Sequence, residues 1–435
     1  MLISTLLLAS VLLTPFDHAT NSSYAVNSKT KEIILNDHSD SPQVPASCMK
    51  IVTTAAALQL LGPEMRFQTD LEYDGAIDRK GTLHGNLYIH GGGDPCLGSN
   101  KIPSVLNWED QIQLWVSAVQ KLGIKKIAGK VIGDATLWES ALAVPSWNFE
   151  DLGNYYGAGA SALSFHENYY TLTFKPGAAL GSATGILRQD PPLPMIILFN
   201  EVTTGPLNSG DCACIYGSEF SLTQRIRGTI PIGVETFSIK GAIPDPAMSC
   251  SYLLSQALAS SKIKVDQKDL IQSKERIVIH TTYSPPLKEI VYWTNQKSIN
   301  LYAEHLLKKI GETVLNEGST TAGVKAVTAF WHSQGIDLHG FNMADGSGLS
   351  RKNGITAKQL VAILLKMKES PHFPLFLNSL PETLPHCKAK SGSMSLIRGY
   401  AGFIDEIAFA ILVNQSTDVD IKDKIKKILL ELGEK

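Results

Sequence analysis

The chain has 435 residues, which is too long for one ordinary domain and predicts two or three. Hydrophobic residues make up 44% of it and charged residues 18%, the proportions of a globular protein with a sizeable core. The formal net charge of −2, a pI of about 6.6 and the absence of a basic cluster argue against nucleic acid as a partner.

The N-terminus carries a short apolar run from Leu2 to Leu13, which Thr14 and Pro15 interrupt. Such a run is too short to cross a bilayer as a helix and suits the core of a signal peptide. It lacks a preceding basic residue and a clean cleavage site, so a buried N-terminal helix is the alternative. We predict that residues 1–21 are an export signal, that the protein is periplasmic or otherwise extracytoplasmic, and that it has no integral membrane span.

Two kinds of element are expected in the first part of the exported chain. Residues 23–35 have the composition of two strands joined by a polar turn. An Ala-rich apolar run from Ser47 to Leu61, followed by Gly62 and Pro63, predicts a buried helix with a clear end.

The start of that helix, Pro45-Ala-Ser-Cys-Met-Lys50, places a serine and a lysine three positions apart. Residues at i and i+3 share one helix face, so Lys50 can reach Ser47. A serine needs an adjacent base to act as a nucleophile, and a lysine can be that base when burial or a second cation lowers its pKa. The spacing also occurs at Ser28/Lys31 and Ser261/Lys264, outside such a helix, and Ser47 alone also fits a helix N-cap.

The middle of the chain is rich in β-structure and both flanks are rich in helix, which predicts an insertion into a first domain. Sequence alternation and Pro/Gly punctuation predict strands at residues 69–75, 85–91, 130–134, 169–174, 195–202, 226–230, 236–242 and 276–280. Helices are expected at residues 107–122 and 251–260. Gly91-Gly-Gly-Asp-Pro95 lacks the Lys-Ser/Thr of a phosphate loop and predicts a tight turn.

A loop from Pro145 to Ala158 gathers aromatic residues, a carboxylate pair and glycines. It fits either a functional loop or packing at a domain junction.

The six cysteines lack zinc-site spacing, because Cys212-x-Cys214 has no C-x-x-C partner, so we expect no metal. Cys48 is most simply a small core residue, and an exported protein can hold one or two disulfides that the sequence does not assign.

From Pro286 onward, helices are expected at residues 287–293, 301–310, 320–334, 356–367 and 421–432. Ser298-Ile-Asn300 supplies a hydroxyl and an amide on the turn before the second of these helices. Lys390-Ser-Gly-Ser393 supplies a cation and two hydroxyls at a predicted strand, residues 387–391, which we expect to lie beside a strand at residues 406–414. The glycine there lets a substrate approach the backbone closely.

Each of these segments also has a purely structural interpretation. Ser298 or Asn300 can cap the helix that follows, and Lys390 can protect the edge of a sheet. Their order along the chain favours chemistry, because a hydrolase of the Ser-Lys kind needs a proton relay, a cation for the substrate carboxylate and backbone N–H donors for the oxyanion.

The three motifs S-x-x-K, S-x-N and K-[T/S]-G form the signature of penicillin-binding proteins and serine β-lactamases. The chain resembles the D-alanyl-D-alanine carboxypeptidase/endopeptidases of the low-molecular-mass class C penicillin-binding proteins, the peptidase S13 family. Further matching segments are Gly85-Asn-Leu-Tyr-Ile, Gly92-Gly-Asp-Pro95, Gly228-Thr-Ile-Pro231, Asn300-Leu-Tyr-Ala-Glu304 and Asp345-Gly-Ser-Gly-Leu-Ser350. The sequence departs from the usual pattern at Cys48 and Ser391, where threonine is commoner.

The resemblance implies a multi-domain α+β fold. Its penicillin-binding, serine β-lactamase-like domain has an α/β/α arrangement with an antiparallel sheet and is interrupted by two inserted β-rich domains. The long interval between Ser47 and Ser298 fits this organisation. The expected boundaries are residues 22–72 and 280–435 for the catalytic domain, 73–98 and 187–279 for inserted domain II, and 99–186 for inserted domain III.

The resemblance also implies a role for each motif residue in a serine D-Ala-D-Ala peptidase of peptidoglycan stem peptides. Ser47 would be the nucleophile and Lys50 its base. Ser298 would relay the proton to the leaving amine, Asn300 would orient Lys50, and Lys390 would support the relay. No cofactor is implied, and β-lactam antibiotics are expected as inhibitors.

The expected substrate-binding residues are also implied by the resemblance. Ser391 and Ser393, on either side of Gly392, would hold the terminal carboxylate. Asp151, Arg351 and Met394 would contact the free end of a diamino acid in the stem peptide. The alternatives are a serine β-lactamase and a catalytically weak peptidoglycan-binding scaffold.

Overall fold

The structure is a computed structural model that describes residue 16, residues 18–273 and residues 275–434. Of the predicted signal segment, residues 1–15 and 17 lie outside the described residues. The chain divides into two compact units, the first made of the residues up to Met65 and from Pro286 onward, and the second of Arg66–Pro285. None of the helices within the described ranges combines the length and the apolar character that a membrane crossing requires.

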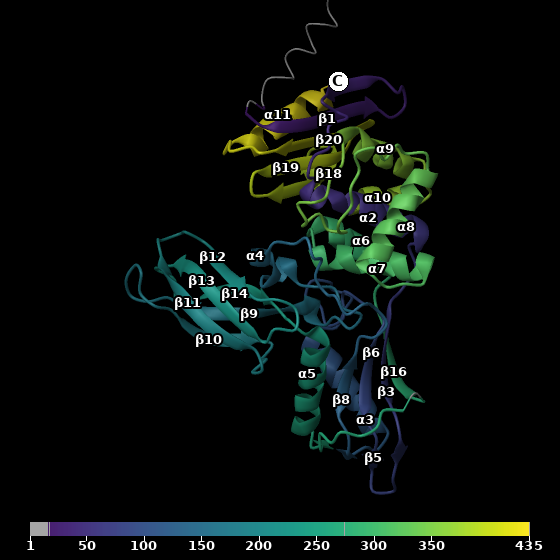
Figure 1. The fold of residues 1–435 in the computed structure, drawn as a ribbon, viewed down its shortest axis with the longest axis vertical. Coiled ribbons are helices and arrows are strands. Elements are labelled where there is room, and N and C mark those ends of the chain that lie inside the picture. Colours follow the sequence, from purple (N-terminus) through teal and green to yellow (C-terminus); the bar gives the residue numbers. More distant parts are fainter. Residues whose placement is uncertain (1–15, 17, 274, 435) are drawn as a thin grey trace, which may run out of the picture. The chain divides into compact units, whose positions relative to one another are not determined.

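The first unit is built on a six-stranded sheet with the order β17-β18-β19-β20-β1-β2 (Figure 1). All five pairs of neighbouring strands are antiparallel. The strands are β1 (Thr20–Asn27), β2 (Ile33–Asp37), β17 (Glu382–Leu384), β18 (Cys387–Met394), β19 (Ile397–Ile404) and β20 (Ile407–Asn414). The first and last parts of the chain therefore share one sheet, because β1 pairs with β20.

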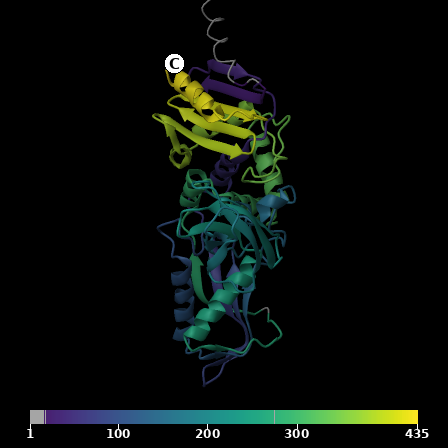
Figure 2. The ribbon, with the colours of Figure 1, turned by 90° about the vertical axis from the view of Figure 1, so that its left-hand side faces the viewer.

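Helices cover both faces of this sheet. They are η1 (Ala46–Cys48), α2 (Met49–Leu60), α6 (Leu287–Gln296), α7 (Asn300–Leu315), α8 (Thr320–Ser333), α9 (Ala357–Lys368), α10 (Phe373–Ser379) and α11 (Ile421–Gly433). Helix α11 packs against β19 on one face of the sheet (Figure 2). Its apolar residues share one buried cluster with Phe409, Ile411 and Val413 of β20. Helix α9 contacts β20, β19 and β1, and α2 packs against α6, α7, α8 and α9. The result is the predicted α/β/α arrangement with an antiparallel sheet.

One prediction about this sheet is wrong. The strands at residues 387–391 and 406–414 are not neighbours, because β19 lies between them and pairs with both. Gly399 and Gly402 interrupt the β-type composition of this segment, which hid the strand. A Cβ at Gly402 would collide with the carbonyl oxygen of Lys388, so the close approach of β18 depends on that glycine.

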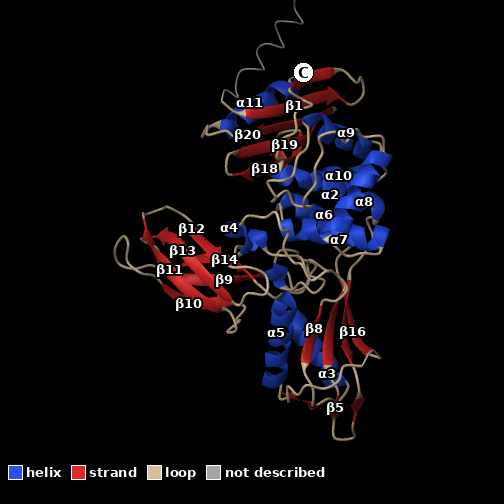
Figure 3. Ribbon diagram, in the orientation of Figure 1, coloured by secondary structure: helices blue, strands red, loops and turns tan. Residues whose placement is uncertain are grey.

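The second unit contains four small sheets with the orders β10-β9-β14, β11-β13-β12, β15-β7-β5-β4 and β16-β3-β6-β8 (Figure 3). Its first eight strands are β3 (Gln68–Tyr73), β4 (Ala76–Ile77), β5 (Thr82–His84), β6 (Leu87–Gly91), β7 (Lys126–Ile127), β8 (Val131–Asp134), β9 (Tyr169–Lys175) and β10 (Gly185–Asp190). The others are β11 (Ile197–Gly205), β12 (Cys212–Tyr216), β13 (Thr223–Pro231), β14 (Phe237–Ala242), β15 (Lys264–Val265) and β16 (Ile277–Tyr283). The middle of the chain is thus β-rich, as the sequence predicts.

The helices of the second unit are α3 (Trp108–Lys121), α4 (Phe149–Leu152), η2 (Tyr155–Gly157), η3 (His166–Asn168) and α5 (Pro246–Ser260). Helix α3 begins where the sequence predicts, because the side chain of Asn107 accepts a hydrogen bond from the backbone N–H of Asp110. Helices α3 and α5 pack against each other and against β16 and β8, respectively. Their apolar faces belong to one continuous core with the strands of the unit.

The boundary between the units differs from the predicted one. Residues 66–72 and 280–285 were assigned to the catalytic domain, but they belong to the second unit. The reason is that β3 and β16 are antiparallel partners in one sheet and therefore belong to the same unit. The chain enters the second unit before β3 and leaves it after β16. The division of the insertion into domains II and III stays a prediction. The six cysteines all lie in the described part of the chain, and none of them forms a disulfide there.

Candidate active site

Ser47 lies in η1, one residue before the N-cap of α2. The backbone of Ala46, directly before it, has φ of +46°, a conformation that an alanine rarely adopts. Two glycines from other segments lie in close contact with this turn. A Cβ at Gly348 would collide with the carbonyl oxygen of Ala46, and a Cβ at Gly392 would collide with the carbonyl oxygen of Pro45. Ser47 therefore does not cap α2, whose N-cap residue is Cys48. Its hydroxyl instead contacts Lys50.

The Lys50 amine is fully buried and has three polar neighbours. Its Nζ lies 3.0 Å from Ser47 Oγ, 2.6 Å from Asn300 Oδ1 and 2.7 Å from the carbonyl oxygen of Ser347. Asn300 is the first residue of α7, and Ser347 lies in the loop between α8 and α9. The predicted contact between the lysine and the serine is present, and two segments far along the chain meet it.

Burial, together with repulsion from Lys390, lowers the pKa of Lys50 to about 7. Asp345 and Glu304 act in the opposite direction. Burial also lowers the pKa of Lys390 to about 8. At neutral pH a substantial fraction of Lys50 therefore carries no proton, as a general base requires.

Lys390 brings the third motif to the same place. It is 1% exposed, and its Nζ donates a hydrogen bond of 2.8 Å to the carbonyl oxygen of Ser391. Strand β18 lies against η1: the Cys48 thiol contacts the carbonyl oxygen of Lys390 at 3.4 Å, and Gly392 abuts Pro45. Burial raises the pKa of Cys48 to about 12, so this thiol stays protonated beside Ser47.

Strand β18 leaves one side of its C-terminal half open. The edge strand β17 pairs with it only as far as Lys388, whereas β19 pairs with it through to Met394. Ser391 and Ser393 are exposed there, and Gly392 between them is buried against η1. Unpaired backbone groups at a sheet edge are the groups that an extended peptide can bind as an added strand.

Ser298 occupies the turn between α6 and α7 with φ of +55°. Among the described residues, no hydrogen bond joins its hydroxyl to Lys50 or Ser47. The structure thus brings Ser47, Lys50, Asn300 and Lys390 together directly, and it places Ser298 two residues before a side chain that contacts Lys50.

A loop that the sequence analysis gave no role holds the third partner of Lys50. The Glu304 carboxylate accepts hydrogen bonds from the backbone N–H groups of Gly346 at 3.0 Å and Ser347 at 2.8 Å. Asp345 accepts bonds from the N–H groups of Gly348 and Ser350, at 2.7 and 2.6 Å. Burial and the nearby Asp345 raise the pKa of Glu304. These two carboxylates fix the Ser347 carbonyl beside Lys50.

The sequence model of the D-Ala-D-Ala carboxypeptidase 3 (S13) family matches residues 7–383. The chain belongs to this family. Membership identifies it as a serine-type D-Ala-D-Ala carboxypeptidase of the penicillin-binding kind, and it confirms the enzyme class that the three motifs predict.

Relatives within the S13 family match nearly the whole chain. A D-alanyl-D-alanine carboxypeptidase of Actinomadura sp. (strain R39) is 27% identical and covers 91% of this chain and 78% of its own length. The D-alanyl-D-alanine carboxypeptidase DacB of Haemophilus influenzae is 24% identical, with coverages of 93% and 87%. The crystal structure of penicillin binding protein 4 (dacB) from Haemophilus influenzae superposes with a TM-score of 0.82 at 22% identity, over 98% of this chain and 99% of that one. This likeness confirms the predicted fold class.

The remaining predicted site residues of this S13 chain lie in different units. Arg351 is exposed and donates a 3.3 Å hydrogen bond to the carbonyl oxygen of Ser395, next to Met394 at the end of β18. Both residues therefore flank the open edge of that strand. Asp151 lies on α4 in the second unit, so its role stays a prediction.

Glu304 and Asp345 are functional candidates that the sequence analysis did not assign. The signal for them was present, because both belong to segments that match the S13 family, Asn300-Leu-Tyr-Ala-Glu304 and Asp345-Gly-Ser-Gly-Leu-Ser350. A buried carboxylate that binds backbone N–H groups of a distant loop cannot be recognised from spacing alone.

Proposed function

We propose that the chain hydrolyses the D-Ala-D-Ala bond of peptidoglycan stem peptides through an acyl-enzyme on Ser47. The observation that carries the proposal is the set of atoms around the Lys50 amine. Two of its three neighbours, Asn300 Oδ1 and the carbonyl oxygen of Ser347, can only accept hydrogen bonds.

An uncharged amine has two N–H donors and one lone pair. If the two donors bind Asn300 and Ser347, the lone pair faces the third neighbour, the Ser47 hydroxyl at 3.0 Å. Ser47 then donates its hydrogen to Lys50, the arrangement from which a base removes a nucleophile's proton. The lowered pKa of Lys50 makes this form available at neutral pH.

In the proposed reaction, Ser47 Oγ attacks the carbonyl carbon of the penultimate D-Ala while its proton moves to Lys50. The backbone N–H groups of Ser47 and Ser393 bind the oxyanion. The C–N bond breaks, and Ser298 relays the proton from Lys50 to the departing amine. Water then attacks the ester, returns a proton through Lys50 and releases the acyl product.

The exposed hydroxyls on β18 support a site for the substrate's C-terminal carboxylate. Ser391 and Ser393 flank Gly392 along the open edge, and the Nζ of Lys390 lies 2.8 Å from the carbonyl oxygen of Ser391. A carboxylate there would accept two hydroxyl donors close to a cation. Arg351 and Met394, at the end of the same edge, and Asp151 are proposed contacts for the diamino acid of the stem peptide.

β-Lactams should acylate the same serine, because the carbonyl of their strained amide and their carboxylate are arranged like those of the D-Ala-D-Ala end of the substrate. A β-lactam complex of the Haemophilus influenzae relative has been solved, and its fold matches this chain with a TM-score of 0.77.

We also propose export to the periplasm or another extracytoplasmic compartment, where peptidoglycan is found.

Two assays test the proposal. Release of D-alanine from a stem pentapeptide should be abolished in the Ser47→Ala variant and retained in Ser28→Ala, which alters a serine with the same Ser-x-x-Lys spacing. Incubation with fluorescent penicillin should give a long-lived label. Rapid loss of the label would favour a β-lactamase, and no label in a folded protein would favour a scaffold. Unchanged D-alanine release in Ser47→Ala would refute the assignment of the nucleophile.

A further inference from the structure

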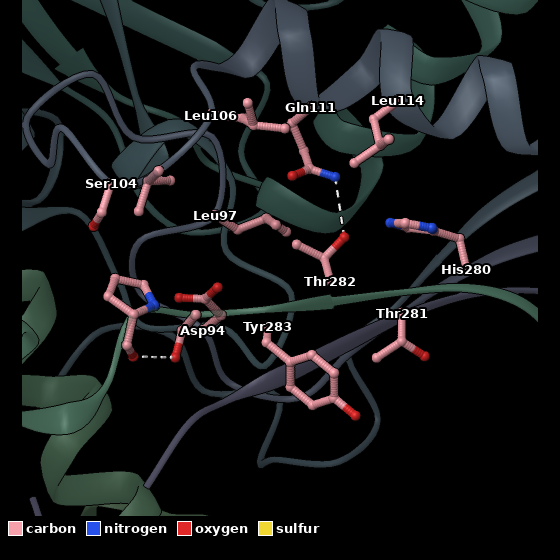
Figure 4. A pocket seen from close by; sticks show the side chains of 13 residues that line it. Asp94, Leu97, Ser104, Leu106, Gln111, Leu114, His280, Thr281, Thr282 and Tyr283 are labelled. Carbon is pink, nitrogen blue, oxygen red and sulfur yellow. Dashed lines mark hydrogen bonds between the residues drawn. The ribbon is translucent and has the colours of Figure 1, made fainter. Parts of the chain in front are cut away.

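The second unit contains a pocket built entirely from its own residues, with a volume of about 220 Å³. Its walls are β16, the first half of α3 and the chain that follows the Gly91–Pro95 turn. In Figure 4, Gln111 and Leu114 of α3 lie across the pocket from Asp94 and Tyr283. None of these residues takes part in the proposed catalytic reaction.

Asp94 is held at the pocket by the glycine run before it. Gly93 has φ of +87°, and a Cβ there would collide with the ring of Trp138. One carboxylate oxygen of Asp94 accepts a 2.8 Å hydrogen bond from the backbone N–H of Cys96. The other has no hydrogen-bond partner within the described part of the chain, although the residue is only 3% exposed. The tight turn that the sequence predicts therefore presents half of a buried carboxylate to the pocket.

The carboxylate has no cationic neighbour that affects its pKa. Burial raises the pKa of Asp94 to about 7, and the opposing influence is the Cys96 N–H. Buried carboxylates in proteins are usually paired with a cation or fully hydrogen-bonded. Burial in the pocket wall, together with Lys121, lowers the pKa of His280, so this imidazole is neutral at neutral pH. Among the described wall residues Asp94 is then the one carboxylate, and with a pKa of about 7 it is about half ionised at neutral pH.

The rest of the wall combines acceptors with apolar surface. The Thr282 hydroxyl accepts a 3.1 Å hydrogen bond from Gln111 Nε2, and the Tyr283 hydroxyl lies on the same strand. Leu97, Leu106 and Leu114 supply apolar contacts. An ammonium group donates hydrogen bonds only, and the open carboxylate oxygen of Asp94 supplies a charged acceptor for it.

We propose that this pocket binds a small compound that carries one primary ammonium group and no carboxylate, with Asp94 as its anionic partner. The volume equals that of roughly seven water molecules, which suits one sugar ring or a short alkyl chain. A free amino acid fits poorly, because no cation on the wall would receive its carboxylate. The same chemistry occurs in an amino sugar with a free amine and in an aliphatic amine.

Calorimetric titration of the full chain tests this proposal and separates the two sources. D-Glucosamine and n-butylamine are the probes, and N-acetyl-D-glucosamine and D-alanine are the controls. At least one probe should bind, and both controls should bind at least about tenfold more weakly, the loss expected for a missing charge-assisted hydrogen bond. Binding of D-glucosamine alone identifies the amino sugar as the source. Binding of n-butylamine identifies the aliphatic amine. If neither probe binds, or the uncharged sugar binds as tightly, the proposal is wrong.

Asp94→Asn keeps the size of the side chain and its acceptor for Cys96, and it should weaken binding of the probe at least about tenfold. Asp110→Asn is the matched control, because it removes an exposed carboxylate from α3 that does not line the pocket. Equal binding by wild type and Asp94→Asn would overturn the proposal. If Asp94→Asn does not fold, Leu106→Trp replaces an exposed wall residue and must weaken binding by obstruction, and unchanged binding in that variant would equally overturn it.

Discussion

Lys50 in the first unit and Asp94 in the second are both buried ionisable side chains whose pKa burial moves to about 7, from opposite directions. Their surroundings differ. All three polar neighbours of Lys50 are fixed by the protein, whereas Asp94 has one hydrogen-bond partner and an oxygen that faces a pocket. The comparison shows that a shifted pKa alone does not define the role of a group. A group with a complete set of fixed partners is suited to proton transfer within the site, and a group with an unfilled position is suited to a ligand.

The largest effect should come from removing the Lys50 amine. Lys50→Met keeps the length of the side chain and removes the base, and acylation by fluorescent penicillin should slow by about a thousandfold, within the usual range for general-base catalysis. Lys427→Met, an exposed lysine of α11 in the same unit, is the control and should leave the rate unchanged. A Lys50→Met rate within threefold of wild type would show that the fixed partners do not serve proton transfer.

A large effect is also expected at the contact between β18 and η1. Gly392→Ala places a methyl group against the carbonyl oxygen of Pro45 and should displace Ser47 from Lys390, so we expect acylation to slow by about a hundredfold. Gly185→Ala is the matched control, because a Cβ there meets no atom within 4 Å. Normal acylation by Gly392→Ala would mean that the two segments do not need this close approach.

A change in the pH profile should follow from removing the second cation. Protonated Lys50 cannot accept the Ser47 proton, so acylation by wild type should fall below a pH of about 7. Lys390 lowers the pKa of Lys50, and Lys390→Met should therefore move this acid limb to higher pH. At pH 6.5 we expect the acylation rate of Lys390→Met to lie roughly three- to tenfold below the plateau rate of the same variant at high pH. If Lys390→Met lowers the acylation rate equally at every pH and leaves the acid limb in place, Lys390 acts in substrate binding only.

The smallest expected effect concerns stability in the second unit. The pKa of Asp94 in the folded chain lies above its unfolded value, so the stability that its neutral form provides is lost as pH rises from about 4 through about 7. Asp94→Asn does not ionise. The melting temperature of Asp94→Asn minus that of wild type should therefore be several degrees larger at pH 8 than at pH 5. This change corresponds to about 2 kcal/mol in the free energy of unfolding. A difference that does not change with pH would show that Asp94 is already paired. Penicillin labelling by this variant should equal that of wild type.

Local patterns in the sequence predicted the parts of the site that depend on spacing. Ser47 and Lys50 meet because they lie three residues apart on one helical turn, and Asn300 starts a helix whose apolar periodicity is clear. The meeting of these segments was predicted by resemblance to a family. Composition alone does not show which distant segments become neighbours, and it did not show the strained turn at Ala46.

The errors of the sequence analysis have physical causes. Strand β19 was missed because glycines at 399 and 402 interrupt its pattern, although the close approach of neighbouring strands requires them. The domain boundaries were misplaced because β3 and β16 pair across more than 200 residues of chain. Glu304 had no predicted role because its function depends on backbone N–H groups of a loop that follows another helix.

The proposed mechanism depends on one pair of atoms, Lys50 Nζ and Ser47 Oγ. Intact mass measurement after incubation with benzylpenicillin, followed by peptide mapping, tests it most directly. We predict one adduct per chain, on Ser47, formed in wild type and Ser28→Ala and absent in Lys50→Met over the same time. An adduct on Cys48, Ser298 or any other residue, or full modification of Ser47 in Lys50→Met, would contradict the account.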